Sequence, residues 1–383
     1  MNTTPRSNRL HIGIFGRRNA GKSSLINAIT GQDAALVSHI KGTTTDPVYK
    51  TMELLPIGPV VLIDTAGIDD ESKLGYLRIE KTQNILRKTD IALLVVDPSQ
   101  GFGTYEEKLI RQLGKTKYLI VYNKSDLGIK YDGLNVSSIT GENIHELKEK
   151  IAEIAQAHEP EPKLVADLLE PKDMVVLVVP IDASAPKGRL ILPQQQVIRD
   201  CLDIGAICVV TQPPELSDTF VKLTSPPKLV ITDSQAFADV AEKTPLDVNL
   251  TSFSILMARY KGVLEYAIES AKIIDVLKDG DKLLIAEGCT HHRQCDDIGT
   301  VKIPRWIEKR TGAKPDYTFT SGGDFPSNLS DYKLIIHCGG CMQNFKEMQY
   351  RQSQAKAQGI PMTNYGVAIS FMQGILERCV RPL

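Results

Sequence analysis

The stretch LHIGIFGRRNAGKSSLINAIT, from Leu10 to Thr30, indicates how the first part of the chain folds. Its opening apolar run predicts a buried strand, and the apolar residues of LINAIT recur at helical spacing. Between them, Gly16–Ser23 fits G-x-x-x-x-G-K-[ST], a loop whose N–H groups hold phosphates at a helix start. We therefore expect Lys22 to reach the outer phosphates and Ser23 to bind Mg²⁺, with further contacts from Asn19, Ala20, Gly21 and Ser24.

Three later motifs follow in the order that a GTP-binding domain requires. VVLIDTAG places Asp64 and Gly67 at the end of an apolar strand, suited to a water-mediated hold on Mg²⁺ and a contact to the γ-phosphate. IVYNKSD ends another strand with Asn123, Lys124 and Asp126, and a carboxylate accepts from both N–H donors of guanine's edge. VSSITGENI supplies Ser138 as a backbone donor to the base. The motifs together predict a site that selects GTP over ATP.

Composition limits the class of protein. The 383 residues contain 45 Lys plus Arg and 46 Asp plus Glu, so the overall charge does not favour nucleic acid as the main partner. The polar start lacks a secretory signal, and no apolar run reaches the roughly 18 residues of a membrane span. Seven cysteines are too few for a disulfide-stapled secreted fold. We expect a cytoplasmic globular protein without a membrane partner.

The rest of the chain predicts two more α/β domains. AHEPEPK, residues 157–163, has the proline and charge content of a linker. After it, strand and helix patterns alternate, which predicts a small α/β layer for self-association in which Cys201 and Cys208 are buried core thiols. From about Thr251 the pattern predicts a long helix. The expected fold is α/β throughout, with domains at 1–160 (GTPase), 164–250 (dimerisation) and 251–383 (metal-binding).

Cysteines follow two apolar strands near the carboxyl terminus. KLLIAEGCTHH places Cys289 and His291 after one strand, and LIIHCGGC places Cys338 and Cys341 after another. Sites in open α/β sheets form outside the carboxyl ends of strands, so we expect the two loops to converge. A CxxC pair alone fits a redox dithiol, half of a zinc site or part of an iron–sulfur site. With Cys289 and His291 it also fits a closed Cys₃His zinc site, which leaves His292 and Cys295 as bystanders.

The first domain resembles translation-factor-related GTPases, most of all the subgroup that acts in transfer-RNA modification and ribosome assembly. GRRNAGKSS is similar to that subgroup's GRxNAGKSS, and GTTTD at residues 42–46 is similar to its GTTRD switch. The resemblance implies that Thr44 binds Mg²⁺ and that Asn19 binds K⁺, helped by carbonyls near Ser38 and Ile40. Two departures predict slow hydrolysis: Ile68 stands where a water-orienting glutamine would be, and Gly75 stands near the place of a downstream glutamate.

The whole chain resembles the FeFe-hydrogenase maturation GTPases, through C-x-H followed by H-C-x-x-C behind a GTPase domain. The resemblance implies a 4Fe–4S cluster on Cys289, Cys338 and Cys341, with a weaker fourth ligand that could be His291, His337, Cys295 or a carboxylate. It also implies a homodimeric scaffold that receives a di-iron precursor from radical SAM maturation enzymes. The expected recipient is the immature FeFe-hydrogenase, with GTP hydrolysis gating partner exchange.

Two other functions fit part of the pattern. The switch motifs alone are typical of a ribosome- or transfer-RNA-associated GTPase with a zinc-stabilised tail. That function requires basic patches interleaved with aromatic residues, and HCGGCMQNFKEMQ shows no such concentration. A thiol–disulfide oxidoreductase would use Cys338 and Cys341 as a dithiol, but it leaves the remote Cys289 unexplained.

Overall fold

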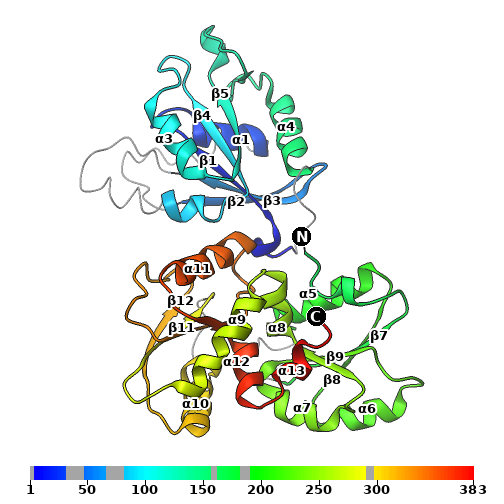
Figure 1. Cartoon of the computed structure of the whole chain (residues 1–383). Helices are drawn as coiled ribbons and strands as arrows, with labels where there is room; N and C mark the ends of the chain where they lie inside the picture. The colour runs from blue at the N-terminus through cyan, green and yellow to red at the C-terminus, as the bar shows by residue number, and fades with distance from the viewer. Residues whose placement is uncertain (1–3, 32–46, 66–81, 157–161, 182–189, 290–296) are drawn as a thin grey trace. The chain divides into compact units, whose positions relative to one another are not determined.

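The chain forms two compact units, Met1–Pro160 and Glu161–Leu383 (Figure 1). The computed structural model describes residues 4–31, 47–65, 82–156, 162–181, 190–289 and 297–383. The first unit contains one sheet, and the second contains two. The α/β class expected from the sequence is confirmed in both units. No helix in the described ranges is both long and apolar enough to cross a membrane.

The first unit is a six-stranded sheet with helices on both faces. Its strand order is β2-β3-β1-β4-β5-β6, and every neighbouring pair is parallel except β2 with β3. Helices α1 and α4 pack on one face, and α3 packs on the other. The predicted strand, loop and helix of the P-loop are confirmed. The elements are β1 (Leu10–Phe15), α1 (Lys22–Thr30), β2 (Val48–Leu54), β3 (Gly58–Asp64), β4 (Ile91–Val96), α3 (Thr104–Leu113), β5 (Lys117–Tyr122), β6 (Leu134–Asn135) and α4 (Ile144–Gln156).

The second unit begins with a four-stranded parallel sheet in the order β10-β9-β7-β8. Helices α5 and α8 cover one face, and α6 and α7 cover the other. The alternation of strand and helix expected for a small α/β layer is confirmed, whereas α6 and β10 were not predicted. The elements are β7 (Met174–Val178), α5 (Leu192–Asp203), β8 (Ile207–Thr211), α6 (Leu216–Lys222), β9 (Leu229–Thr232), α7 (Phe237–Lys243) and β10 (Asn249–Ser252).

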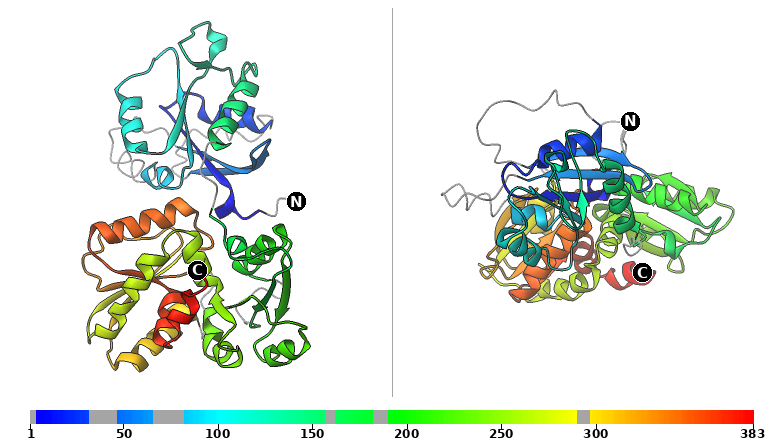
Figure 2. Two further views of the ribbon diagram at one scale, coloured as in Figure 1. Left: turned by 45° about the vertical axis from the view of Figure 1, so that its right-hand side comes forward. Right: turned by 90° about the horizontal axis from the view of Figure 1, so that it is seen from above.

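The other sheet of the second unit is also parallel, in the order β12-β11-β13-β14. Helices α9, α10, α12 and α13 pack against one face, while α11 packs against the other, as Figure 2 shows from two further sides. The elements are α8 (Phe253–Tyr260), α9 (Leu264–Ala271), β11 (Lys282–Glu287), α10 (Ile303–Thr311), β12 (Asp316–Ser321), β13 (Leu334–His337), α11 (Phe345–Ala357), β14 (Met362–Asn364), α12 (Tyr365–Met372) and α13 (Leu376–Val380).

The long helix predicted from about Thr251 is wrong. Thr251 lies in β10, and the helical pattern that follows is divided between α8 and α9. Gly262 separates the two helices with φ +66°, a left-handed conformation that ends a right-handed helix. The break lets α8 contribute to both cores of the unit, because Leu256 packs under the first sheet and Ile255 under the second.

Candidate functional site

The phosphate loop has the backbone that the P-loop motif requires. Gly16 and Gly21 have φ values of +153° and +89°, and a Cβ atom at Gly16 would lie 2.3 Å from the Val95 carbonyl oxygen. Only glycine fits there. Lys22 is 8% exposed, and its ammonium group donates to the carbonyls of Gly16 (3.0 Å) and Arg17 (2.8 Å). The loop therefore holds a positive charge where the outer phosphates would bind.

The Mg²⁺ side of the site joins the start of α1 to the end of β3. The Ser23 hydroxyl donates to Oδ2 of Asp64 at 2.6 Å. Burial raises the pKa of Asp64, although the Ser23 hydrogen bond and the Lys22 charge act in the opposite direction. A desolvated carboxylate beside a hydroxyl suits a divalent cation, because oxygen ligands are those that Mg²⁺ prefers.

The guanine side of the site is assembled from two loops that contact each other directly. Asn123 is fully buried, its amide donates to the Ala20 carbonyl at 3.1 Å, and its Oδ1 accepts from the Ser138 backbone N–H at 3.1 Å. The Ser137 hydroxyl donates to Oδ1 of Asp126 at 2.6 Å. These bonds fix the positions of the carboxylate and the backbone donor that were predicted to read the base.

A partly buried ion pair between Lys124 and Asp97 supports this loop, and no sequence motif predicted it. Lys124 has φ +65°, and its ammonium donates to Oδ2 of Asp97 at 2.6 Å. Burial alone would raise the pKa of Asp97, but hydrogen bonds from Lys124 and Ser99 outweigh it and lower that pKa. The ion pair stabilises the strained residue that carries the NKSD turn.

Several predicted site residues lie outside the described residues, so the structure does not address them. They are Ser38, Ile40, Thr44, Gly67, Ile68, Gly75, His291, His292 and Cys295.

The three predicted cluster ligands, called the thiol centre below, follow two neighbouring strands. Cys289 lies two residues after β11, and Cys338 and Cys341 come directly after β13. These strands are paired, with Ala286 opposite His337. The Sγ atom of Cys338 accepts from the backbone N–H groups of Gly288 at 3.0 Å and Gly340 at 3.4 Å. The loop of Cys289 therefore contacts the sulfur of the CGGC turn directly.

The thiols of the centre lie close enough to affect one another's ionisation. Burial, and next the charges of Cys338 and Cys341, raise the pKa of Cys289 to about 12. Burial and Cys338 raise the pKa of Cys341 to about 11, while the buried ammonium of Lys261 acts in the opposite direction. The three thiols therefore resist losing their protons together. A bound cation would stabilise the three thiolates, because its charge offsets the repulsion between them.

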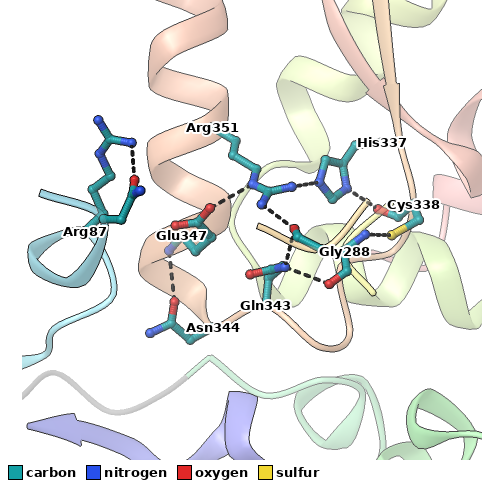
Figure 3. Close-up of polar contacts among 10 residues, drawn as sticks. Arg87, Gly288, His337, Cys338, Gln343, Asn344, Glu347 and Arg351 are labelled. Atoms are coloured by element: carbon teal, nitrogen blue, oxygen red, sulfur yellow. Dashed lines mark hydrogen bonds and ion pairs between the residues drawn. The ribbon is translucent and has the colours of Figure 1, made fainter. Parts of the chain in front are cut away.

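A buried network fixes the strand end that precedes Cys338 (Figure 3). Arg351 of α11 is fully buried, and it donates to Glu347 Oε1, His337 Nε2 and the Gly322 carbonyl, each at 2.9 Å. Arginine only donates, so His337 Nε2 accepts, and its Nδ1–H donates to the Cys338 carbonyl at 2.8 Å. Burial, and next the Arg351 charge, lower the pKa of His337 to about 3. Both ring nitrogens are thus engaged by protein groups.

Gln343 ties the loops of three strands together, as Figure 3 shows for its contact with Gly288. Its side-chain amide donates to the carbonyls of Gly288 at 2.7 Å and Gly322 at 3.0 Å. Sequence reasoning missed Gln343, Arg351 and Glu347, because the segment after the CGGC turn is rich in polar residues and its helical part reads as a solvated face. One sequence feature could have revealed two of them: Glu347 and Arg351 are spaced i, i+4, as in a helical ion pair, shortly after the CGGC turn.

The donor set of the thiol centre fits an iron–sulfur cluster by ligand type. Cysteine thiolates hold such clusters, and N–H groups that donate to the sulfur atoms help to set the reduction potential. The N–H groups of Gly288 and Gly340 donate to Cys338 in this way. Within the described ranges, no three His, Cys, Asp or Glu side chains are grouped so as to hold one metal ion. In a 4Fe–4S cluster each thiolate binds a different iron, so the ligands surround the group and do not meet at one ion.

Three family models match most of the chain. Residues 164–262 match the Hydrogen maturase F dimerization domain, and residues 265–382 match the Hydrogen maturase F tetramerization domain. These two matches together span more than half of the chain. Residues 11–124 match the 50S ribosome-binding GTPase family, which covers the phosphate loop and the start of the NKSD motif.

Individual curated relatives match about a third of the chain. The tRNA modification GTPase MnmE of Lactobacillus acidophilus is 35% identical over 138 residues, which are 36% of this chain and 30% of that protein. GTPase Der of Kosmotoga olearia is 40% identical over 126 residues, 31% of this chain and 28% of that one. The chain spans about a third of the length of these curated relatives.

Solved GTPase structures resemble the chain more weakly. Aquifex aeolicus Era bound to GDP and aluminium fluoride has a TM-score of 0.34 and 19% identity, covering 53% of this chain and 93% of that one. The G domain of the T. maritima FeoB iron transporter has a TM-score of 0.31 and 29% identity, covering 39% of this chain and all of that one.

Proposed function

We propose that this chain, which belongs to the hydrogen maturase F family, is a GTP-switched scaffold for a 4Fe–4S cluster held by Cys289, Cys338 and Cys341. The observation that carries the proposal is the convergence of three thiols from two paired strands, in which Cys338 and Cys341 raise the pKa of Cys289 and Cys338 raises that of Cys341. The MnmE relative covers only 36% of this chain, whereas the two maturase models cover residues 164–262 and 265–382, which include the thiol centre.

The cluster, when bound, supplies an iron position that three thiolates leave to an exchangeable ligand. The chain's own residues hold the thiols in place: the N–H groups of Gly288 and Gly340 donate to Cys338, and the ammonium of Lys261 offsets thiolate charge at Cys341. His337 reaches the centre as a ligand only if it gives up its bond with Arg351. We therefore favour a positioning role for His337 and leave His291, Cys295 or a carboxylate as candidates for the fourth ligand.

In the first unit, GTP binding is proposed to set the state of the scaffold. Lys22 contacts the outer phosphates, Ser23, Thr44 and Asp64 hold Mg²⁺, and Gly67 contacts the γ-phosphate. Asn123, Asp126 and Ser138 hold guanine, in the positions that their hydrogen bonds fix. Loss of the γ-phosphate releases such switch loops, which suits exchange between radical SAM maturation enzymes and the immature FeFe-hydrogenase.

Potassium is proposed as a further cofactor at Asn19. This residue has φ +62°, a conformation that asparagine tolerates, and it lies in the loop beside the phosphates. A monovalent cation there would stabilise charge in the transition state as an arginine does. Comparing GTP hydrolysis in K⁺ and Na⁺ at equal ionic strength tests this, and equal rates would remove Asn19 from the site.

Self-association is proposed through the domains at 164–250 and 251–383. The two matched family descriptions name dimerisation and tetramerisation, so we expect at least a homodimer. We place the assembly in the cytoplasm, where a reducing environment keeps the thiols of the centre available. Light scattering of the purified protein at several concentrations measures the oligomer directly.

Anaerobic reconstitution tests the scaffold. We expect about four irons per chain, with a paramagnetic signal on reduction. Cys289→Ser, Cys338→Ser and Cys341→Ser should each lose cluster while GTP hydrolysis persists. Cys379→Ser is the matched control, because Cys379 is fully buried in the same unit but lies on α13. One tightly bound zinc and no iron would contradict the proposal.

A further inference from the structure

The two sheets of the second unit repeat one arrangement. Counted along the chain, each sheet has its strands in the order 4-3-1-2 or its reverse, which gives β10-β9-β7-β8 and β12-β11-β13-β14. The pairing register is shared as well, because Val175 lies opposite Leu229 as Leu283 lies opposite Leu334. We call β7 to α8 the first repeat and β11 to α12 the second repeat, and their residues can be matched one by one.

The match extends to the sequence. LTSFSILMARYKGVLE, residues 250–265, corresponds to MTNYGVAISFMQGILE, residues 362–377, with glycine, leucine and glutamate at the same places after the helix. Both glycines are left-handed, with φ values of +66° and +75°. The helix starts agree too, since Ser252 and Asn364 each accept a hydrogen bond from the backbone N–H three residues on. The first repeat is therefore an internal reference for the repeat that carries the thiol centre.

The two repeats differ beside the thiol centre. After the last residue pair between the first and third strands comes Val179 in the first repeat and Glu287 in the second. The helix after the fourth strand begins with Phe253 in the first repeat and Tyr365 in the second. Val179 and Phe253 pack in one apolar core. Burying a carboxylate costs free energy that burying valine does not, so the fold itself does not require the Glu287–Tyr365 pair.

Glu287 and Tyr365 meet where the chain leaves β11 for Cys289. Both side chains are buried, and the Tyr365 hydroxyl donates to Oε1 of Glu287 at 3.2 Å. Leu283 and Ile285 pack in the same core as Tyr365, and Glu287 continues that face of β11 because side chains alternate along a strand. Cys289 follows two residues later.

A second segment packs on the same pair. A Cβ atom at Gly299 would lie 2.2 Å from the Tyr365 hydroxyl oxygen and 2.8 Å from Oε1 of Glu287. Two residues earlier, Asp297 accepts from the N–H and the hydroxyl of Thr300 at 2.8 Å and 2.9 Å, which fixes the start of this segment. The pair therefore joins the end of β11 to the segment around Gly299.

We infer that Glu287 and Tyr365 are positioning residues, whose hydrogen bond fixes Cys289 in the thiol centre. A hydrogen bond is directional and apolar contact is not, so the polar pair restrains the strand end more closely than valine and phenylalanine would. The first repeat has Ile181 in place of Cys289, and it has the apolar pair. The inference rests on the proposed scaffold function, but the position of Cys289 can be measured without a cluster.

Alkylation of metal-free, full-length protein tests the inference. The chain is treated anaerobically with iodoacetamide for increasing times, denatured with isotope-labelled reagent and digested with trypsin, which releases residues 283–293 with Cys289 as their one cysteine. Tyr365→Phe should raise the alkylation rate of Cys289 by about two- to tenfold, as the loss of one hydrogen bond allows. Gly299→Ala should act likewise, because its methyl group displaces the Tyr365 hydroxyl. Unchanged rates in both variants would overturn the inference.

Two further variants separate positioning from stability. Tyr266→Phe is the control, because its hydroxyl donates to the Ile360 carbonyl at 3.0 Å in the same unit, and it should leave the Cys289 rate unchanged. Glu287→Val with Tyr365→Phe reproduces the pair of the first repeat. Replacing both partners of a hydrogen bond by apolar groups is nearly neutral, so urea unfolding should stay close to wild type while Cys289 is alkylated faster. Wild-type protection of Cys289 in this double variant would contradict a positioning role.

Anaerobic reconstitution distinguishes this inference from the scaffold function itself. Wild type and Tyr365→Phe should both bind about four irons, and the variant should release iron to a chelator about two- to tenfold faster, with a changed paramagnetic signal on reduction. Equal release and identical signals would remove the pair from the site and leave the scaffold intact. Wild-type protein without iron would contradict the scaffold, while the alkylation rates would still decide what positions Cys289.

Discussion

The guanidinium group of Arg351 donates from Nη1 to Nε2 of His337 across 2.9 Å, in a place where both side chains are fully buried. This contact fixes the histidine tautomer, so its other nitrogen donates to the carbonyl of Cys338. Arg351 also binds Glu347, which is 5% exposed. One helix, α11, thereby controls the position of the strand end that carries the CGGC turn.

Replacing Arg351 should be strongly destabilising. Arg351→Met leaves the buried Glu347 carboxylate without its ion-pair partner, which costs about 3–5 kcal/mol of unfolding free energy. Arg310→Met is the matched control, because Arg310 pairs with Asp275 at the surface and should cost less than about 1 kcal/mol. Urea unfolding of both variants measures the difference. Equal losses would show that the Arg351 network does not stabilise the fold.

His337 should make the protein less stable as the pH falls. Its pKa drops from 6.5 to about 3 on folding, so between these values the unfolded chain binds a proton that the folded protein does not. The contribution is complete above pH 6.5 and is lost as the pH falls toward 3. His337→Gln should flatten the decline in unfolding free energy of metal-free protein between these limits, whereas the exposed His145→Gln should not. Identical pH slopes for wild type and His337→Gln would contradict the assignment.

The CGGC turn should not tolerate a side chain at its second glycine. Gly340 has φ +64°, and a Cβ atom there would lie 2.7 Å from the Met348 sulfur. Gly340→Ala should cost at least about 1–2 kcal/mol and expose Cys338 and Cys341 to faster alkylation. Gly323→Ala is the control, because nothing lies within 4 Å of its added methyl group. Unchanged alkylation rates in Gly340→Ala would show that the turn rearranges freely.

Lys22→Ala should abolish GTP turnover. Its ammonium is the buried charge of the phosphate loop, and phosphoryl transfer depends on such a charge beside the leaving group. Lys150→Ala removes a partly exposed lysine of α4 that pairs with Glu146, and it should leave turnover unchanged. Phosphate release under saturating GTP is the measurement. Persisting turnover in Lys22→Ala would mean that the phosphate site lies elsewhere.

Asp126→Asn should weaken GTP binding and favour xanthosine triphosphate. The amide replaces one acceptor oxygen by a donor, which guanine's N–H edge cannot pair with. Losing a charged hydrogen bond costs about 1.5–3 kcal/mol, or roughly a ten-fold to hundred-fold rise in Kd. Calorimetry with GTP and with xanthosine triphosphate measures the change in preference. The Ser137 hydroxyl, which donates to Asp126 at 2.6 Å, should hold the new side chain in the same place. Unchanged preference for GTP would remove Asp126 from the base site.

The sequence predicted the elements whose signals are local. The P-loop strand, its glycines and the helix from Lys22 follow from periodicity and turn chemistry within a few residues. The same holds for the strands that end at Glu287 and His337, whose apolar runs are unambiguous. The long helix failed because Gly262 alone marks the break, and a single glycine in a helical pattern is usually tolerated.

The tertiary contacts of the site could not be predicted. Arg351 and Gln343 lie on a polar segment that would be read as solvated, and only packing against the sheet reveals that they are buried. The pairing of Lys124 with Asp97 joins residues from β4 and β5 loops with no shared motif.

The single amide nitrogen of Gln343 holds the carbonyls of Gly288 and Gly322 at once. If either loop moved away from Gln343, the hydrogen bond that Gln343 makes to the other loop would also be disturbed. The loops after β11 and β12 are therefore coupled through Gln343, which follows Cys341 by two positions. A partner that binds either loop would therefore shift the backbone groups that contact the sulfur atoms of the thiol centre.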